Sequence, residues 1–348
     1  MKYGSILLLF LPAAALSYYL GGPPVFTFFA AAVALIYLAA AMGWATEVLA
    51  ARAGPTIGGL LNATLGNAAE FIIALVGVRA GLSVVVKASL TGSILGNSLL
   101  VLGMSFLVGG LRHKLQTFNV RNATMGATLM VLAVSALLMP SLLHYIGRGE
   151  AISEHRLSLA ISIILVVAYV ASIVFSLITH RHIFPHHRDK EEEGKKRPIA
   201  WASVVLGLTT VGIVAAAELL VAVVEPTAHA LGWSDVFIGI VVVAVAGNAA
   251  ENFAAILMAW RNRMDLAITI TQGSSMQIAL LVAPLIVIIS YVWPQPLDLI
   301  FTPLEVAAVA VSMLICSLIT GDGESNWFEG LLMLALYAIL GVTFFFAA

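Results

Sequence analysis

Long runs of apolar residues recur along almost the whole chain, and short stretches rich in polar residues, glycine or proline separate them. Most of these runs reach the length of about 20 residues that a helix needs to cross the hydrocarbon core of a bilayer. The pattern predicts an all-α, multi-pass membrane protein with eleven transmembrane helices, at about 5–20, 25–49, 56–78, 83–110, 121–143, 156–179, 199–224, 235–259, 265–291, 302–320 and 326–347. The first segment also fits a secretory signal peptide, and this alternative stays open.

One strongly hydrophilic stretch divides the chain near its middle. We predict an extra N-terminal helix in residues 1–22, a five-helix unit in 23–180, a hydrophilic linker in 181–198 and a second five-helix unit in 199–348. The linker is rich in histidine and in charges of both signs, so pH sensing or metal binding would be compatible with its composition. A solvated connecting loop is the simpler interpretation.

Lysine and arginine predict how the chain is oriented, because they concentrate in loops on the cytoplasmic side of a membrane. With the N-terminus inside and eleven crossings, 13 of the 17 basic residues fall inside and 4 fall outside. The four outside are Arg79, Lys87, Arg148 and Arg156. We therefore expect a cytoplasmic N-terminus, a cytoplasmic linker and an external C-terminus.

Composition narrows the classes of function. Hydrophobic residues make up 61% of the chain, charged residues 10%, and mean hydropathy is +1.03, so most side chains must face lipid or one another. The net charge of −1 gives no basic excess for nucleic acid. Cys316 is the only cysteine, which excludes a disulfide framework and a thiolate metal site. The sequence has no nucleotide-binding motif and no bond-making catalytic group, so we expect neither an enzyme nor a bound cofactor.

A five-residue motif occurs once in each half of the chain. Gly66-Asn67-Ala68-Ala69-Glu70 recurs as Gly247-Asn248-Ala249-Ala250-Glu251, at an offset of 181 residues. The same offset relates three further pairs: Ile57-Gly58 and Ile238-Gly239, Gly92-Ser93 and Gly273-Ser274, and Leu99-Leu100-Val101 and Leu280-Leu281-Val282. These matches favour an internal duplication. Because each repeat has five helices, an odd number, the two motif helices would cross the membrane in opposite directions. Such inverted-topology repeats are common in secondary transporters.

Glu70 and Glu251 are the candidate binding residues. Gly66 and Gly247 precede them by one helical turn and would let the two helices cross closely, which would bring the carboxylates together. Two carboxylates offer up to four oxygens and balance one divalent ion, and calcium takes six to eight oxygen ligands. Close, poorly hydrated carboxylates also hold protons, so protons and calcium would compete for one site. The alternative is that both glutamates are protonated and only join helices.

Neutral polar residues could complete this site. Asn67 and Asn248 share the helix faces of the motif glutamates, and backbone carbonyls freed at the motif glycines could add oxygens. On the following segment of each half we expect further ligands or wall residues, namely Ser93, Asn97, Ser274 and Gln277. Hydrogen bonding between helices is the alternative explanation for these small polar residues.

Two further glutamates, Glu47 and Glu218, lie within apolar segments that precede the motif segments. An ionised carboxylate at the bilayer centre costs about 2.5–3.5 kcal/mol, so these side chains should face protein, water or a cation. We weigh two roles equally, a place on the proton or access pathway and a structural hydrogen bond or salt bridge.

The segment from Gly59 to Glu70, GLLNATLGNAAE, resembles the first signature repeat of the cation/proton exchanger (CAX) family, within the calcium/cation antiporter superfamily. Residues 247–252 resemble the second repeat, and Thr46-Glu47, 92–97 and 273–279 are also similar to that family. The resemblance covers nearly the whole chain. It implies eleven helices, calcium export driven by inward proton flow, and a site built on both motif glutamates. It also implies site roles for both motif asparagines and Gln277, and pathway roles for Glu47 and Glu218. The acidic part of the linker is short, which puts a regulatory acidic helix in doubt.

We therefore predict a secondary active transporter that exchanges cytoplasmic Ca²⁺ for external H⁺ by alternating access, in a prokaryotic cell membrane. Its partners would be the two ions and the lipid bilayer, and assembly into a homo-oligomer is left open. The first alternative is a sodium/calcium exchanger of the same superfamily, whose repeats usually carry proline before the glutamate, where this chain has Ala69. A cation channel is a further alternative, although it gives no reason for paired titratable glutamates.

Overall fold

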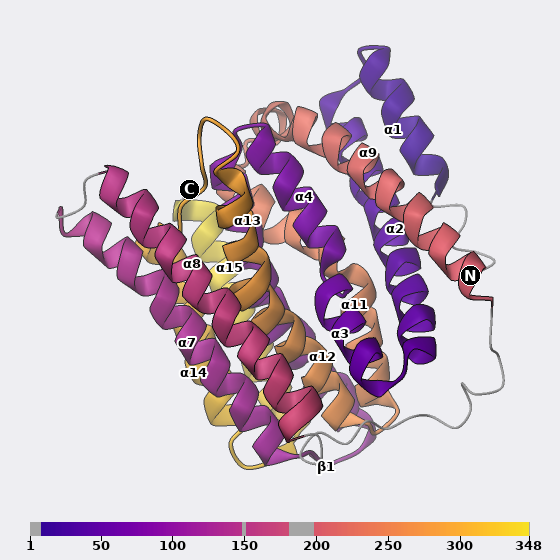
Figure 1. The fold of residues 1–348 in the computed structure, drawn as a ribbon, viewed down its shortest axis with the longest axis vertical. Helices are drawn as coiled ribbons and strands as arrows, with labels where there is room; N and C mark the ends of the chain where they lie inside the picture. The colour runs from indigo at the N-terminus through magenta and orange to yellow at the C-terminus, as the bar shows by residue number, and fades with distance from the viewer. Residues whose placement is uncertain (1–7, 148–150, 181–197, 348) are drawn as a thin grey trace.

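The computed structural model describes residues 8–147, 151–180 and 198–347. The described chain forms a bundle of helices, shown in Figure 1. The first half contains α1 (Phe10–Tyr19), α2 (Pro24–Ala53), α3 (Pro55–Leu65), α4 (Ala68–Arg79), α5 (Ser83–Leu95), the π-helical segment η2 (Gly96–Val101), α6 (Leu102–Arg112), β1 (Gln116–Thr117), α7 (Val120–Tyr145), α8 (Ala151–Val174) and π-helical η3 (Phe175–Thr179). The second half contains α9 (Ile199–Leu231), α10 (Asp235–Phe237), π-helical η5 (Ile238–Val243), α11 (Ala244–Trp260), α12 (Met264–Gln277), π-helical η6 (Ile278–Val282), α13 (Ala283–Ser290), α14 (Pro303–Ile319), β2 (Glu324–Ser325) and α15 (Trp327–Ala347).

The helices explain the apolar segments of the sequence. Each of the eleven predicted segments contains helix where the structure describes it. Eight helices in the described residues are long and apolar enough to cross a membrane, and the bent pair Asp235–Ala249 and Glu251–Trp260 would make a ninth. α14 has 17 residues and α1 has 10, so both are shorter. The protein is an integral membrane protein, while the count of eleven crossings stays a prediction. The predicted linker lies almost wholly outside the described residues.

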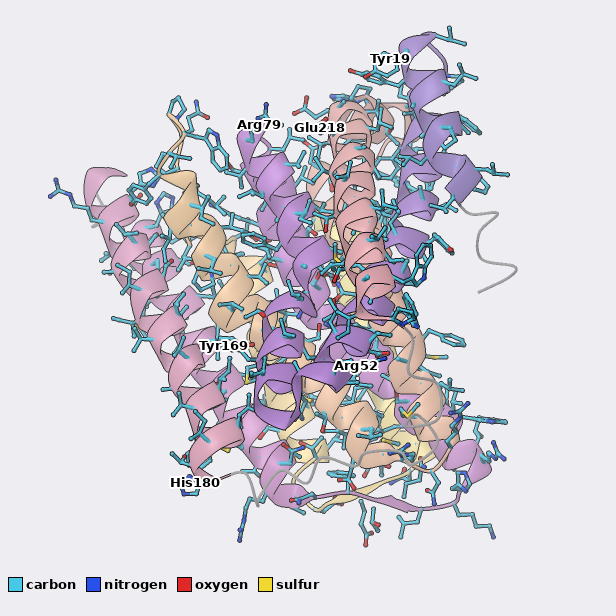
Figure 2. The ribbon with its side chains drawn as sticks, turned by 45° about the vertical axis from the view of Figure 1, so that its right-hand side comes forward. Tyr19, Arg52, Arg79, Tyr169, His180 and Glu218 are labelled. Carbon is cyan, nitrogen blue, oxygen red and sulfur yellow. The ribbon has the colours of Figure 1, made fainter. Side chains whose placement is uncertain are left out.

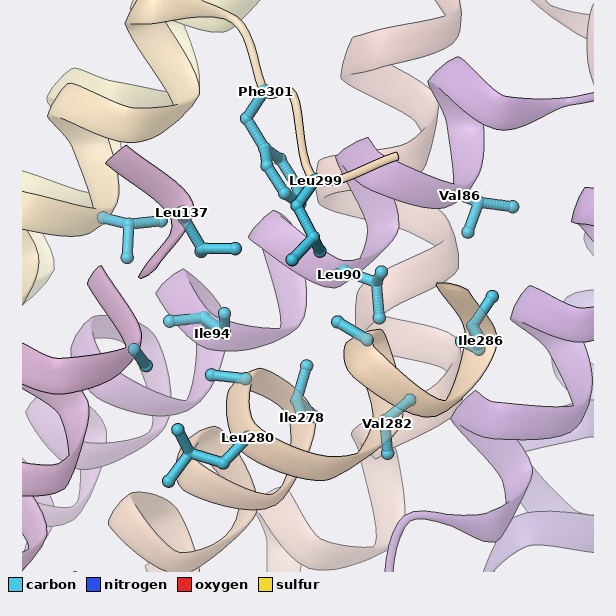
Figure 3. Close-up of a cluster of buried hydrophobic side chains, with 14 of the residues drawn as sticks. Val86, Leu90, Ile94, Leu137, Ile278, Leu280, Val282, Ile286, Leu299 and Phe301 are labelled. Carbon is cyan, nitrogen blue, oxygen red and sulfur yellow. The ribbon is translucent and has the colours of Figure 1, made fainter. Parts of the chain in front are cut away.

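The two largest of three clusters of buried apolar side chains in the described residues hold different parts of the bundle together. One joins α2 to α9, which pack along each other in Figure 1, and it includes Phe28, Leu35, Ile213 and Leu220. The other joins α5 to the η6–α13 segment and also takes in side chains of α7 and α8. Figure 3 shows its centre, where Leu90 and Ile94 of α5 lie near Ile278 and Ile286. Because this cluster contains residues of both halves, it fixes α5 and α12–α13 against each other.

The two ends of the bundle can be told apart. β1 and the end of η3 at His180 lie at one end, whereas the C-terminal end of α15 lies at the other (Figures 1 and 2). At the first end, β1 and β2 form an antiparallel pair in which Gln116 faces Ser325. The sequence pattern did not predict this strand pair, because two residues are too few to show an alternation. It joins the segment before α7 to the segment before α15.

Candidate cation-binding site

The first motif interrupts its helix. α3 ends at Leu65 and α4 begins at Ala68, and Asn67 between them has the non-helical angles φ −101° and ψ 29°. The break places Glu70 in the first turn of α4, where the positive end of the helix dipole favours a carboxylate. We expected a similar break at Gly247, but this residue lies inside α11. The second-half chain bends by 68° only between 235–249 and Glu251–Trp260. The second motif is therefore bent three residues after its glycine, although no helix end falls there.

Each motif glycine faces the glutamate of the other half. A Cβ added to Gly247 would lie 3.1 Å from Oε1 of Glu70, and one added to Gly66 would lie 3.5 Å from Oε1 of Glu251. The absence of these two side chains therefore lets the motif segments approach at the level of both carboxylates. The carboxylate of Glu251 is close enough for its charge to act on Glu70. Because Glu70 is only 9% exposed, little water is present to screen this interaction.

A buried hydrogen-bond network joins the first motif to α12 and η2. Asn67 donates from Nδ2 to Oε1 of Gln277 at 2.7 Å and accepts at Oδ1 from the hydroxyl of Ser274 at 2.9 Å. The same hydroxyl oxygen accepts from Nδ2 of Asn97 at 2.9 Å. These contacts fix the orientation of the Asn67 amide, because both of its ends have partners.

The network continues to the second motif. Nδ2 of Asn97 lies 3.5 Å from Oδ1 of Asn248, and Nδ2 of Asn248 donates to the hydroxyl of Ser93 at 2.9 Å. All four predicted wall residues and both motif asparagines thus belong to one network between the two halves. Whether any of them binds an ion stays a prediction.

Glu251 has one unsatisfied carboxylate oxygen, as the adjacent Asn252 has one unsatisfied amide oxygen. Within the described residues, Oε2 of Glu251 is buried and has no hydrogen-bond partner. Burying such an oxygen without a partner costs free energy of folding unless a proton, a water molecule or a cation binds to it. A cavity of about 310 Å³ reaches Glu251 and is also lined by Gly66, Gly273, Ser274 and Gln277. The unsatisfied carboxylate is therefore the one that the cavity makes accessible.

The cavity contains polar residues that the sequence analysis missed. They come from α3, α7, α8, η3 and α12, and they are Asn62, Asn122, Ser172, Ser176, Thr269 and Gln272. One signal was available, because Thr269, Gly273 and Gln277 follow one another at intervals of four and so share a face of α12. The residues of α7 and α8 gave no such signal, since only the packing of the helices brings them to this place.

The two upstream glutamates lie in different surroundings. Glu218 of α9 is exposed, and one of its carboxylate oxygens lies 3.9 Å from the guanidinium of Arg79 at the end of α4. Figure 2 shows both residues at the end of the bundle opposite His180. This pair matches the structural salt bridge that we weighed, and it places Glu218 away from the motif crossing. Glu47 of α2 is also exposed, and its charge acts on Glu251. A pathway role for either residue stays a prediction.

One sequence pattern of a known family occurs in both halves. The model of the family described as sodium/calcium exchanger protein matches residues 23–178 and again residues 201–346. The chain belongs to this exchanger family. Each matched segment carries one of the two motifs, so the reciprocal contacts of the site join two segments that fit the same family pattern.

Individual relatives are also similar to this exchanger. This chain is 44% identical over 317 residues to the Ca(2+)/H(+) antiporter ChaA of Bacillus subtilis (strain 168), and the aligned region covers 90% of each chain. It is 42% identical over 358 residues to the Ca(2+)/H(+) antiporter of Aphanothece halophytica, and the aligned region covers 98% of this chain and 95% of that one. The solved structure of native YfkE superimposes with a TM-score of 0.86 at 39% identity and covers 99% of both chains. The predicted resemblance to cation/proton exchangers is therefore confirmed.

Proposed function

We propose that this chain is a Ca²⁺/H⁺ antiporter that moves cytoplasmic calcium outward in exchange for protons, through one site built on Glu70 and Glu251. The observation that carries the proposal is the reciprocal approach of each motif glycine to the glutamate of the other half. At such a crossing, two carboxylates can balance one divalent cation or be neutralised by protons. The relatives named Ca(2+)/H(+) antiporter support the choice of ions.

The same two carboxylates would serve both ions in turn. Calcium binds the deprotonated pair, and protons that bind later remove the charge that holds calcium. The network around the pair is made of neutral serine, asparagine and glutamine side chains. The absence of charged side chains from this network suits proton coupling better than the binding of several sodium ions.

Access would alternate between the two sides of the membrane. Gly92 and Gly273 are equivalent at the offset of 181, but their surroundings differ. A Cβ on Gly92 would overlap the carbonyl oxygen of Ile240 in η5, so α5 and η5 are in close contact. A Cβ on Gly273 would meet nothing within 4 Å, and Gly273 lines the cavity. If the two halves exchanged these arrangements, the cavity would move to the other side, as inverted repeats allow.

The cavity in this structure would face the cytoplasm. It is lined by Asn122 near the start of α7, by Thr269 near the start of α12 and by Ser176 in η3. These ends adjoin the basic residues Arg121 and Arg263, which the excess of positive charge assigns to the cytoplasmic side. In this state Glu251 would be the carboxylate that first meets calcium.

Transport by reconstituted protein tests the proposal. Vesicles that carry an imposed pH gradient should take up radiolabelled calcium, and an imposed sodium gradient of equal size should not replace it. Glu70→Gln and Glu251→Gln should each abolish uptake, because one charge cannot balance the ion. Glu225→Gln is the matched control, since Glu225 is an exposed glutamate of α9. Uptake that follows sodium would overturn proton coupling, and normal uptake by Glu70→Gln would overturn the site.

A further inference from the structure

We propose that Glu305 is the carboxylate that a transported cation meets on the side of the membrane opposite the present cavity. The inference rests on the proposed exchange function. It follows from two helix starts, those of α7 and α14, which contact the other half of the chain in the same way.

The two helices begin with the same kind of cap. The side chain of Asn119 caps α7 by accepting from the backbone N–H of Asn122, and the side chain of Thr302 caps α14 by accepting from the backbone N–H of Glu305. Asn122 and Glu305 are therefore both the third residue of their helix. Each helix is the fourth predicted span of its half, so the two residues occupy equivalent positions at opposite ends of the bundle.

Both residues reach across to the third span of the other half. Nδ2 of Asn122 donates to the hydroxyl of Thr269 on α12 at 3.0 Å. The hydroxyl of Thr91 on α5 donates to Oε1 of Glu305 at 3.2 Å. Two threonine contacts thus join α7 to α12 at one end and α14 to α5 at the other.

The two ends differ in whether there is space beside these contacts. Asn122 and Thr269 line the cavity of about 310 Å³. Thr91 and Glu305 adjoin a cavity of only about 10 Å³, which is room for about one water, and Glu305 is 3% exposed. The close contact of Gly92 with Ile240 lies directly beside Thr91. Asn122 now lies at the open cavity. If the contact between Gly92 and Ile240 opened, Glu305 would lie at an equivalent entrance on the other side.

The third position of the two helices would then differ in chemistry, with the neutral amide of Asn122 at one entrance and the carboxylate of Glu305 at the other; Asp265 at the first entrance accepts from the backbone N–H of Asn119. Oε2 of Glu305 accepts from the backbone N–H and the hydroxyl of Thr302 at the start of α14, while Oε1 accepts from Thr91. Lys87, one turn before Thr91 on α5, pairs with Asp298 and donates to the carbonyl oxygen of Ile300. Val134 and Leu137 of α7, which also line the small cavity, are apolar. Once the contact opens, the carboxylate of Glu305 would offer its oxygens to a divalent cation at this entrance.

Calcium dependence measured separately on the two sides tests this assignment. Right-side-out and inside-out membrane vesicles containing the full chain would be compared, with calcium as the only probe. Glu305→Gln should raise the half-saturating calcium concentration on one side by about fivefold, the size expected for one charge acting on a divalent ion through mostly aqueous surroundings. The value on the other side should stay unchanged. Asn122→Asp should lower the half-saturating concentration on that other side.

Two controls separate this role from a purely structural one. Glutamine is also accepted in the third position of a capping box, so Glu305→Gln retains the helix start. Thr302→Ala removes the cap but keeps the carboxylate, and it should not reproduce the one-sided shift. The assignment is overturned if Glu305→Gln changes neither side, changes both sides equally, or behaves like Thr302→Ala. Absence of exchange in the unchanged protein would instead overturn the proposed function.

Discussion

The hydroxyl of Ser274 donates a hydrogen bond to Oδ1 of Asn67 at 2.9 Å, and both side chains are buried. The bond joins α12 of the second half to the break in the first motif helix. Because the oxygen of Ser274 also accepts from Asn97, one hydroxyl connects three segments around the motif crossing. The geometry of Glu70 and Glu251 therefore depends on neutral residues of both halves.

Removal of this hydroxyl should weaken both stability and transport. Ser274→Ala would leave Oδ1 of Asn67 and one amide hydrogen of Asn97 without their present partner, and an unsatisfied buried polar group costs about 1–3 kcal/mol. We expect a lower thermal midpoint of the purified protein and slower calcium uptake. Ser135→Ala is the matched control, because this exposed serine of α7 bonds only to its own helix, at the carbonyl of Val131. An unchanged midpoint and unchanged uptake in Ser274→Ala would show that the network is dispensable.

A methyl group at the first motif glycine should obstruct the site. A Cβ on Gly66 would lie 2.8 Å from the carbonyl oxygen of Asn62, 3.2 Å from Oε1 of Gln277 and 3.5 Å from Oε1 of Glu251. Overpacking of this kind typically costs about 1–3 kcal/mol, so Gly66→Ala should reduce the initial rate of calcium uptake by about tenfold or more. Gly207→Ala, whose Cβ would meet nothing within 4 Å, should transport normally. Equal rates in the two variants would contradict the close crossing.

Two equivalent glycines should respond differently to the same substitution if access alternates. Gly92→Ala collides with the backbone of Ile240 in the present state, so it should lower the thermal midpoint. Gly273→Ala has free space in the present state and should leave the midpoint unchanged. It should nevertheless impair exchange, because the opposite state would bring Gly273 into the close contact that Gly92 makes now. Normal exchange by Gly273→Ala would count against a swap of arrangements between the halves.

The sequence predicted the features that depend on composition and on short-range spacing. Apolar length was enough to locate the helices, and the duplicated glycines and glutamates were enough to predict that the motif segments cross. The position of Glu218 could not be predicted this way, because an apolar segment alone does not show that its glutamate faces Arg79 at one end of the bundle.

Features that arise from contacts between distant segments were also missed. Gln272, Ser172 and Ser176 line one cavity only because α12 packs beside α7 and α8. The sequence symmetry of the two motifs suggested a helix break at Gly247, whereas the second-half chain bends three residues later and within α11. Equal sequence in two halves does not require equal conformation, because the two motif glycines have different neighbours, Asn62 and Gln277 beside Gly66 and Glu70 beside Gly247.

The exposed pair of Arg79 and Glu218 allows a test of the pathway role of Glu218. Exposed salt bridges contribute about 0–1 kcal/mol, so Glu218→Gln should change the thermal midpoint little. If Glu218 only pairs with Arg79, calcium uptake and its dependence on external pH should also stay unchanged. A shift in the external pH dependence that Arg79→Gln does not reproduce would favour a place on the proton pathway. The double variant provides the control for coupling between the two residues.

Competition between protons and calcium fixes the sign of the pH dependence. Calcium needs deprotonated carboxylates, so its apparent affinity on the cavity side should rise as the pH on that side rises. In the range where the carboxylates are mostly protonated, the half-saturating calcium concentration should fall about tenfold per pH unit if one proton is displaced, and about a hundredfold if two are displaced. Uptake measured at several calcium concentrations and pH values gives this slope directly. Because Glu70 and Glu251 each lie against the motif glycine of the other half, calcium should displace protons from both, and the slope should exceed that of one proton. A half-saturating concentration independent of pH would exclude a shared site.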